Sequence, residues 1–273
     1  INIMRSTIVF ISLIILVIAN SYTDISAKSR KLFNCTNKIK RAKKYYKKHQ
    51  FYRTKTALTD VKINCSGHSS MDTVLYILSR SNLETKNVME ARLDLEVLIQ
   101  DFPNSPFVEE AYFLLGYCSF RESESYERDQ VKTREAINEF KNYIVNFPNS
   151  SYKDSARHYL NLCQEKLVKK EIMNARFYEK IDQYDAAIVY YKFIIKDFAD
   201  SKNITECRFA LYRNLMKTSR PKEAKTVLEG IISSETDEES KRKAENLLNK
   251  LNLSKEEGKL KTKPDNTENT SKP

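Results

Sequence analysis

Phe102-Pro103-Asn104-Ser105 recurs along this chain, first as Phe147-Pro148-Asn149-Ser150 and then, in altered form, as Phe198-Ala199-Asp200-Ser201. A stripe of apolar residues precedes each copy. The first residue of the stripe lies eleven positions before the Phe, and further apolar residues lie four, seven and eight positions after that first residue. An Ala starts every stripe: Ala91, Ala136 and Ala187. Spacings of four, seven and eight place apolar side chains on one face of a helix, and repetition in one frame indicates an array of helical units.

The frame matches the tetratricopeptide pattern, in which a small residue, a Phe and a Pro mark the second helix of each pair. Pro103 and Pro148 lie twelve residues after their Ala, and Leu115-Gly116 lies where the pattern has Leu-Gly. Weaker copies flank the clear ones at 54–65 and 224–232, as expected for end repeats that face solvent on one side. The sequence therefore predicts an all-α fold: a tetratricopeptide (TPR) superhelix of about five helix pairs with a C-terminal capping helix.

The frame also predicts the domain boundaries. We expect the solenoid domain to cover residues 36–251 and residues 252–273, which are polar and Lys-rich, to form a disordered tail. A charged insertion at 122–132 breaks the period inside the third pair. The predicted first helices of the pairs, followed by the capping helix, are 36–49, 70–83, 107–121, 152–180, 203–218 and 237–251.

The N-terminal segment reads as a targeting sequence. Arg5 precedes an apolar run at 7–19, which is too short to span a bilayer comfortably and is typical of a signal peptide. We expect residues 1–27 to be the signal peptide, with an uncleaved anchor as the alternative, and residues 28–35 to be a basic linker.

The five cysteines divide into two groups. Cys118, Cys163 and Cys207 fall on helix faces where the repeats need small apolar residues, so we expect buried thiols. Export would permit a Cys35–Cys65 disulfide, but no framework spacing supports one, and that pairing stays open.

Cys35 is also a candidate for lipidation as the first residue of a mature chain. Leu32 stands three residues before it, as a lipidation signal requires. Asn34 replaces the usual small residue immediately before the Cys, and the charged stretch 28–31 separates Cys35 from the apolar run.

The positive charge is concentrated near the N-terminus. The net charge is +11, yet residues 28–59 contain twelve Lys and Arg and no Asp or Glu, so the rest of the chain is nearly balanced. Such a segment attracts anionic lipid headgroups, acidic proteins or nucleic acid, or it forms a solvated face of the first helix. For an exported protein we expect no nucleic acid partner.

No group of residues suggests catalysis. The three His share no metal-ligand spacing, and Cys65 with His68 lacks a second pair, so no metal is expected. Four scattered Gly do not form a phosphate-binding loop. Acidic pairs such as Glu109-Glu110 are expected on solvent faces. We therefore predict a protein that is not an enzyme and has no cofactor.

The insertion and the helices after it carry a specific resemblance. Arg128-Asp129-Gln130, Thr133 and Glu135-Ala136-Ile137 are followed by Ala175-Arg176-Phe177-Tyr178 and Tyr184-Asp185-Ala186-Ala187. This order resembles the BamD family, the tetratricopeptide component of the bacterial β-barrel assembly machine, over about residues 36–233.

The resemblance implies a lipoprotein scaffold on the periplasmic face of the outer membrane. Its implied partners are the barrel-forming subunit BamA and unfolded outer-membrane proteins. Two alternatives remain: a general exported TPR adaptor for another cell-envelope complex, and a cell-wall enzyme or its activator.

In the family, inward-facing positions of the first helices line a concave groove. Aromatic residues beside cations there would suit an extended peptide that ends in an aromatic residue and a carboxylate, although packing could explain each residue singly. The basic front helix is a second candidate surface, for a barrel protein or for lipid, because Lys43, Lys44, Lys47 and Lys48 recur at helical spacing. Counting from the small residue of each first helix gives these groove candidates: Lys43, Tyr46, Tyr76, Arg80, Phe113, Tyr117, Arg176, Phe209 and Arg213.

Overall fold

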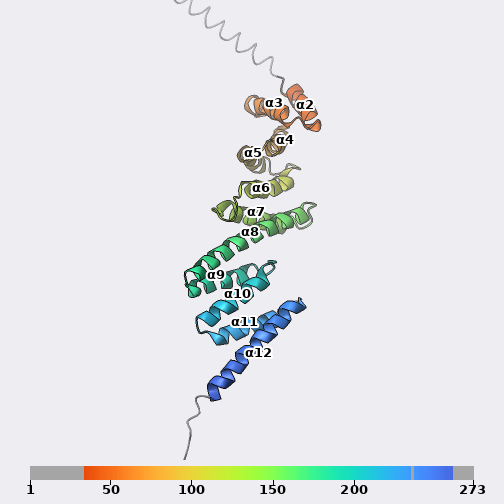
Figure 1. Cartoon of the computed structure of the whole chain (residues 1–273). Helices are drawn as coiled ribbons and strands as arrows, with labels where there is room; N and C mark the ends of the chain where they lie inside the picture. Colours follow the sequence, from red (N-terminus) through yellow and green to blue (C-terminus); the bar gives the residue numbers. More distant parts are fainter. Residues whose placement is uncertain (1–33, 235–236, 261–273) are drawn as a thin grey trace, which may run out of the picture. The chain divides into compact units, whose positions relative to one another are not determined.

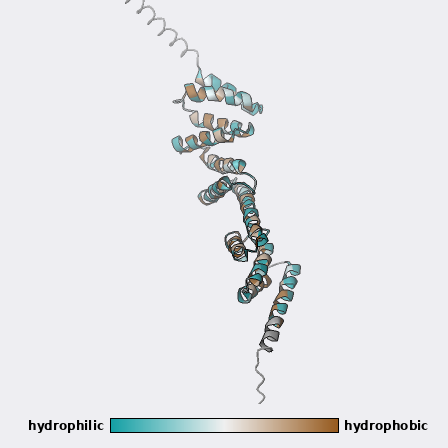
Figure 2. Ribbon diagram, turned by 60° about the vertical axis from the view of Figure 1, so that its left-hand side comes forward, coloured by the Kyte–Doolittle hydropathy of each residue, from teal (hydrophilic) through white to brown (hydrophobic). Residues whose placement is uncertain are grey.

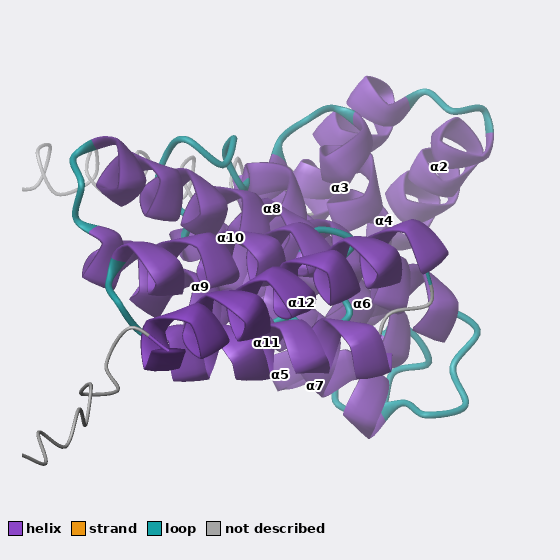
Figure 3. Cartoon of the chain, turned by 60° about the horizontal axis from the view of Figure 1, so that its bottom comes forward, coloured by secondary structure: helices purple, strands orange, loops and turns teal. Residues whose placement is uncertain are grey.

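The computed structural model describes residues 34–234 and 237–260, which form eleven helices and no strand (Figures 1 and 3). Every predicted first helix begins and ends within two residues of its expected position. This agreement confirms the all-α tetratricopeptide fold. The first helices are α2 (Cys35–Lys47), α4 (Met71–Glu84), α6 (Val108–Glu122), α8 (Lys153–Lys180) and α10 (Ile204–Lys217). The second helices are α3 (Phe51–Asn64), α5 (Val88–Asp101), α7 (Val131–Asn146), α9 (Tyr184–Asp197) and α11 (Pro221–Ser234).

The last helix, α12 (Glu238–Leu260), is longer than predicted. Asp237 caps it by accepting a hydrogen bond from the Ser240 N–H at 2.9 Å. The expected tail began at residue 252, but the helix continues to Leu260, because the Lys and Glu residues that make this stretch polar also favour helix. The predicted signal peptide, linker residues 28–33 and tail residues 261–273 lie outside the described residues.

The described residues group into two compact units. The first contains 34–122 and 142–153, and the second contains 123–141 and everything from 154 onward. Within each unit, apolar residues (brown in Figure 2) alternate with hydrophilic ones along the helices, as amphipathic packing requires. No helix among the described residues has the length and apolarity needed to cross a bilayer.

Small residues set the packing inside each unit. Ala91 in the first unit and Ala136, Ala187 and Ala224 in the second have no exposed surface. In the second unit Ala175 of α8 lies in one core with Ala187 and Tyr191 of α9. Small side chains at these points allow two helices to approach closely.

The recurring Phe-Pro-Asn-Ser phrase forms a turn that ties one helix pair to the next. The Ser105 N–H donates to the Phe102 carbonyl at 2.9 Å, and the Ser105 hydroxyl donates to Asp72 of α4 at 2.9 Å. Ser150 repeats this arrangement, with its N–H bonded to the Phe147 carbonyl and its hydroxyl to Glu109 of α6. The Ser therefore closes the turn and links it to an earlier helix.

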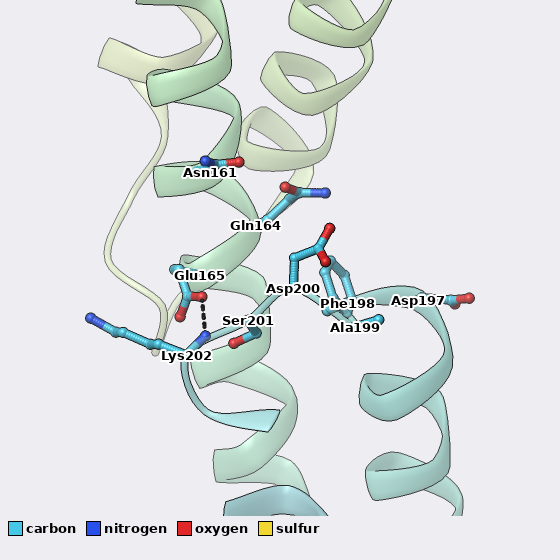
Figure 4. A pocket seen from close by; sticks show the side chains of 9 residues that line it. All are labelled: Asn161, Gln164, Glu165, Asp197, Phe198, Ala199, Asp200, Ser201 and Lys202. Atoms are coloured by element: carbon cyan, nitrogen blue, oxygen red, sulfur yellow. Dashed lines mark hydrogen bonds between the residues drawn. The ribbon is translucent and has the colours of Figure 1, made fainter. Parts of the chain in front are cut away.

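The third copy makes the same turn with a different link. The Ser201 N–H donates to the Phe198 carbonyl at 3.0 Å. Here the carboxylate comes from Glu165 of α8, which accepts from the Lys202 N–H at 3.1 Å (Figure 4). Glu165 also accepts from the Asn203 side chain at 2.9 Å. The turn persists although Ala199 replaces the Pro, so the Ser-centred hydrogen bonds are its constant feature.

A disulfide joins the two helices of the first pair. Cys35 begins α2 and Cys65 caps the end of α3, with their Cα atoms 6.0 Å apart. The pairing that the sequence left open is therefore formed. A sulfur in a disulfide cannot also carry a lipid thioether, so this bond and lipidation of Cys35 exclude one another in the same molecule.

The other three cysteines are buried thiols, as predicted. Burial raises the pKa of the Cys163 thiol to about 11 and that of the Cys207 thiol to about 12. Both side chains thus stay protonated at neutral pH and act as small apolar residues.

We expect the double substitution C35S/C65S to lower the free energy of unfolding of the first unit by roughly 3 kcal/mol, because the bond constrains a loop of 30 residues in the unfolded chain. Denaturant titration with and without reductant measures this difference. Reductant should destabilise the unsubstituted protein and leave the variant unchanged; equal curves for the unsubstituted protein in both conditions would contradict the disulfide.

Candidate functional site

The insertion that breaks the repeat period folds as a tight loop at residues 123–130. Gln130 holds it together, since its side-chain amide donates to the carbonyl oxygens of Ser125, Arg128 and Asp129 at 2.7 to 3.1 Å. Its side-chain oxygen accepts from the buried Thr133 hydroxyl at 2.8 Å. The Asp129 carboxylate accepts from the Val131 N–H at 2.8 Å and so caps α7. The Asp-Gln…Thr motif therefore builds the loop.

Two lysines of α8 fix this loop in place within the second unit. Lys166 donates to the hydroxyl of Ser123 at 2.6 Å, and Lys170 donates to the carbonyl of Glu127 at 3.1 Å. These charge-assisted bonds hold the loop alongside α8, with Tyr126 between its two anchored ends.

The anchored loop forms one wall of an open pocket of about 580 Å³, which we call the α8 pocket. Three elements contribute to it: the loop, α8 and the beginning of α10. The pocket combines the exposed ring of Phe177 with an apolar floor at Ile172. Its three cations, Lys169, Arg176 and Lys180, line the pocket together with one carboxylate, that of Glu206. Its lining residues are Tyr126, Lys169, Ile172, Met173, Arg176, Phe177, Lys180, Asn203 and Glu206.

Arg176 and Phe177 give this pocket its chemical character. Phe177 is 57% exposed, which is unusual for a Phe, and it meets Tyr178 edge-on at 5.5 Å. Arg176 pairs with Glu206 at 2.6 Å, with both side chains more than half exposed. An exposed pair of this kind contributes only about 0–1 kcal/mol, so Arg176 can exchange Glu206 for another carboxylate at small cost.

A related group of side chains lies in the first unit, and we call it the Tyr76 cluster: Tyr76, Arg80, Phe107 and Glu110. Tyr76 stacks on Phe107 at 4.3 Å and donates to Glu110 at 2.8 Å, while Arg80 forms a close ion pair with the same carboxylate. Burial and the bond to Glu110 raise the pKa of Tyr76 well above its usual value, so the phenol remains a donor. Arg80–Glu110 and Arg176–Glu206 are each 30 residues apart and occupy equivalent repeat positions.

This cluster corrects the expectation for Glu110 alone. Glu109 is exposed, as expected, and accepts a hydrogen bond from the Ser150 hydroxyl. Glu110 was also placed on a solvent face, but it is only 15% exposed and binds Arg80 and Tyr76. The carboxylate that Arg80 was expected to take from a ligand is supplied by the chain itself.

The remaining groove candidates have different surroundings. Phe113 and Phe209 lie in the core, 8% and 6% exposed, where Phe113 stacks on Tyr152 and Phe209 packs with Leu228. They are packing residues. Tyr117 accepts from Arg121, and Arg213 is exposed.

Tyr46 and Lys43 belong to the first helix pair. Tyr46 meets Phe51 edge-on at 5.9 Å and lies near enough to Arg80 and Tyr76 to influence their pKa values, so it joins the Tyr76 cluster. Lys43 lies in a separate groove along α2. The structure thus brings Tyr46, Tyr76 and Arg80 together and leaves the other candidates apart from them.

Comparison with known proteins identifies the family. A family model described as YfiO, outer membrane lipoprotein, matches residues 39–228. The chain belongs to this family. The resemblance drawn from the insertion is thereby confirmed, and the matched segment contains both the Tyr76 cluster and the α8 pocket.

Individual relatives agree with this assignment. The outer membrane protein assembly factor BamD of Caulobacter vibrioides is 28% identical over 136 residues, covering 50% of this chain and 45% of that protein. BamD of Neisseria gonorrhoeae is 29% identical over 140 residues, covering 46% of this chain and 52% of its own length. The chain thus spans about half the length of the curated relatives it matches. A solved TPR protein of Thermus thermophilus is 16% identical over 79% of this chain and 99% of its own, with a TM-score of 0.35.

Sequence reasoning missed several pocket residues. Tyr126, Lys169 and Lys180 have no repeat-frame signal, because the frame describes core positions and these side chains face outward. The sequence carried one signal for the two ion pairs: Arg80 and Glu110, like Arg176 and Glu206, are 30 residues apart. Throughout the described residues, no cluster of His, Cys, Asp or Glu side chains could hold a metal ion.

We expect Gln130→Ala to open the loop, because it removes the donor that joins three loop carbonyls and leaves the buried Thr133 hydroxyl without its partner, a loss of about 1–3 kcal/mol. Hydrogen exchange of residues 123–130 should accelerate while exchange in α10 and α11 stays unchanged. Glu124→Ala is the matched control, since Glu124 forms only an exposed pair with Arg128. Equal exchange in both variants would show that Gln130 does not hold the loop.

Proposed function

We propose that this protein is a scaffold of the outer-membrane β-barrel assembly complex, located on the periplasmic face of the outer membrane. In this role it binds the barrel-forming subunit, a relative of BamA, and unfolded outer-membrane proteins before their insertion. The observation that carries the proposal is the family match over residues 39–228, supported by relatives that are themselves named outer membrane protein assembly factors.

The α8 pocket is our proposed contact for an unfolded barrel protein. An extended segment that ends in an aromatic residue and a carboxylate would place its ring against Phe177 and its carboxylate on Arg176, in competition with Glu206. The neighbouring Lys169 and Lys180 add attraction for a negatively charged end. The Tyr76 cluster fits this role less well, because Glu110 is largely buried and already occupies Arg80.

The alternative is a general TPR adaptor for another cell-envelope complex. The two proposals share the fold and differ in the partner that is recovered. The insertion loop favours the assembly scaffold, because its Asp129-Gln130 is part of the resemblance to that family. A loop built by Gln130 and held to α8 by two lysines is also not needed for the repeat itself.

Affinity purification of the tagged protein from mildly solubilised envelopes tests the scaffold directly. We expect the barrel-forming subunit to be the main partner identified by mass spectrometry. Recovery of a different envelope complex without that subunit would favour the adaptor and overturn the proposal.

The same preparation tests the pocket. Arg176→Glu with Phe177→Ala should reduce capture of unfolded barrel proteins at least tenfold, while the barrel-forming subunit is still recovered. The matched control on the same helix is Arg157→Glu with Leu162→Ala, which changes an exposed Arg and an exposed apolar residue outside the pocket. Equal capture by both double variants would show that the α8 pocket does not bind unfolded barrel proteins.

A further inference from the structure

The charged residues on the outward side of α2 are all cationic. Ile39 and Ala42 face the core, and every residue on the opposite arc from Lys40 to Lys48 that carries a charge is a Lys or Arg. The helical spacing gathers these side chains into one surface, and all of them are exposed. We call this surface the basic face: Lys40, Arg41, Lys44, Lys47 and Lys48.

The chain supplies almost no negative charge to this surface. Between residues 34 and 71 there are ten Lys and Arg and a single acidic residue, Asp60. Asp60 pairs with Lys38 at 3.4 Å on the flank of α2 that faces α3. Among the described residues, Lys40, Lys44, Lys47 and Lys48 have no ion-pair partner, so the face keeps its full attraction for an external anion.

Grooves flank the basic face on both sides. One, of about 540 Å³, runs between α2 and the turn after α3, where Ile39 forms an apolar floor beneath Lys40, Lys43 and Lys44. The other, of about 600 Å³, lies between α2 and α3 and contains Tyr45 and Tyr52. In the second groove the Arg41 guanidinium lies 5.5 Å from the centre of the Tyr45 ring and donates to its hydroxyl at 2.7 Å.

These side chains are the types that favour a membrane interface. Lys and Arg place their charges among lipid phosphates while their aliphatic stems cover apolar surface, and Tyr sits at the level of the headgroups. Tyr52 is 73% exposed and projects beside the cations. We infer that the basic face of α2 docks on an anionic phospholipid surface, with phosphate groups entering the flanking grooves.

The extent of the face favours a membrane over a single acidic peptide. The cations cover the outward arc of α2 and continue into grooves on both of its sides, whereas an extended peptide would follow one groove. A planar array of phosphates can meet the whole arc at once.

Vesicle binding by the purified full-length protein tests this inference independently of the assembly complex. We expect binding to vesicles with one-third phosphatidylglycerol to exceed binding to pure phosphatidylcholine vesicles, and the excess to fall as salt rises. Changing Lys40, Lys44, Lys47 and Lys48 to Gln should weaken the anionic-specific binding at least tenfold, since each Lys near such a surface contributes roughly fivefold.

The matched control changes Lys141, Lys196, Lys222 and Lys250 to Gln, which removes the same charge from exposed sites elsewhere. It should bind like the unsubstituted protein. Equal binding to both kinds of vesicle, or equal losses in the two quadruple variants, would overturn the inference. Complete competition by inorganic phosphate or by polyglutamate would likewise overturn it in favour of a free anion or an acidic protein.

A fluorescence reporter locates the contact, because the chain contains no Trp. A Trp introduced by Tyr52→Trp should shift to shorter wavelength on anionic vesicles, whereas one introduced by Val189→Trp, at an exposed site in α9, should not. A shift at position 189 without one at position 52 would place the membrane contact elsewhere and refute docking through α2.

Discussion

The structure depends on one packing constraint: a pair of amphipathic helices cannot bury its apolar stripe without a neighbour. Close approach within and between pairs requires small side chains, and Ala91, Ala136, Ala187 and Ala224 meet that need with no exposed surface. The Ser-centred turns then set where each new pair begins. Ser105 and Ser150 do so by bonding both to their own turn and to a carboxylate on an earlier helix.

The features that distinguish this chain are additions to that framework. The Gln130 side chain joins three carbonyls of the insertion loop to Thr133 of α7, and Lys166 and Lys170 hold the loop to α8. The motif that best identifies the family is therefore an architectural one. Its consequence for binding is indirect, because it places Tyr126 beside Arg176 and Phe177 and so completes a pocket that the repeat alone would leave open.

The repeat frame predicted the helices and the core well because both follow from local periodicity. It could not predict interactions set by the angle between successive pairs. Arg80 looked available for a ligand, but Glu110, 30 residues away, occupies it. The same limit applies to the Cys35–Cys65 bond, which depends on how α2 crosses α3. Phe113 and Phe209 were predicted to line a groove, but both are buried in the core. Counting positions along a helix does not distinguish a side chain that lines a groove from one that packs in the core below the groove.

We propose that the α8 pocket and the cationic first helix serve a role in barrel assembly at the outer membrane. Conditional depletion of the protein in its own bacterium tests that role most directly, with folded outer-membrane barrels followed by their heat-modifiable migration. The account predicts that newly made barrels stop folding while inner-membrane proteins accumulate normally. Normal barrel folding after complete depletion would contradict it and leave the chain as an adaptor for another envelope complex.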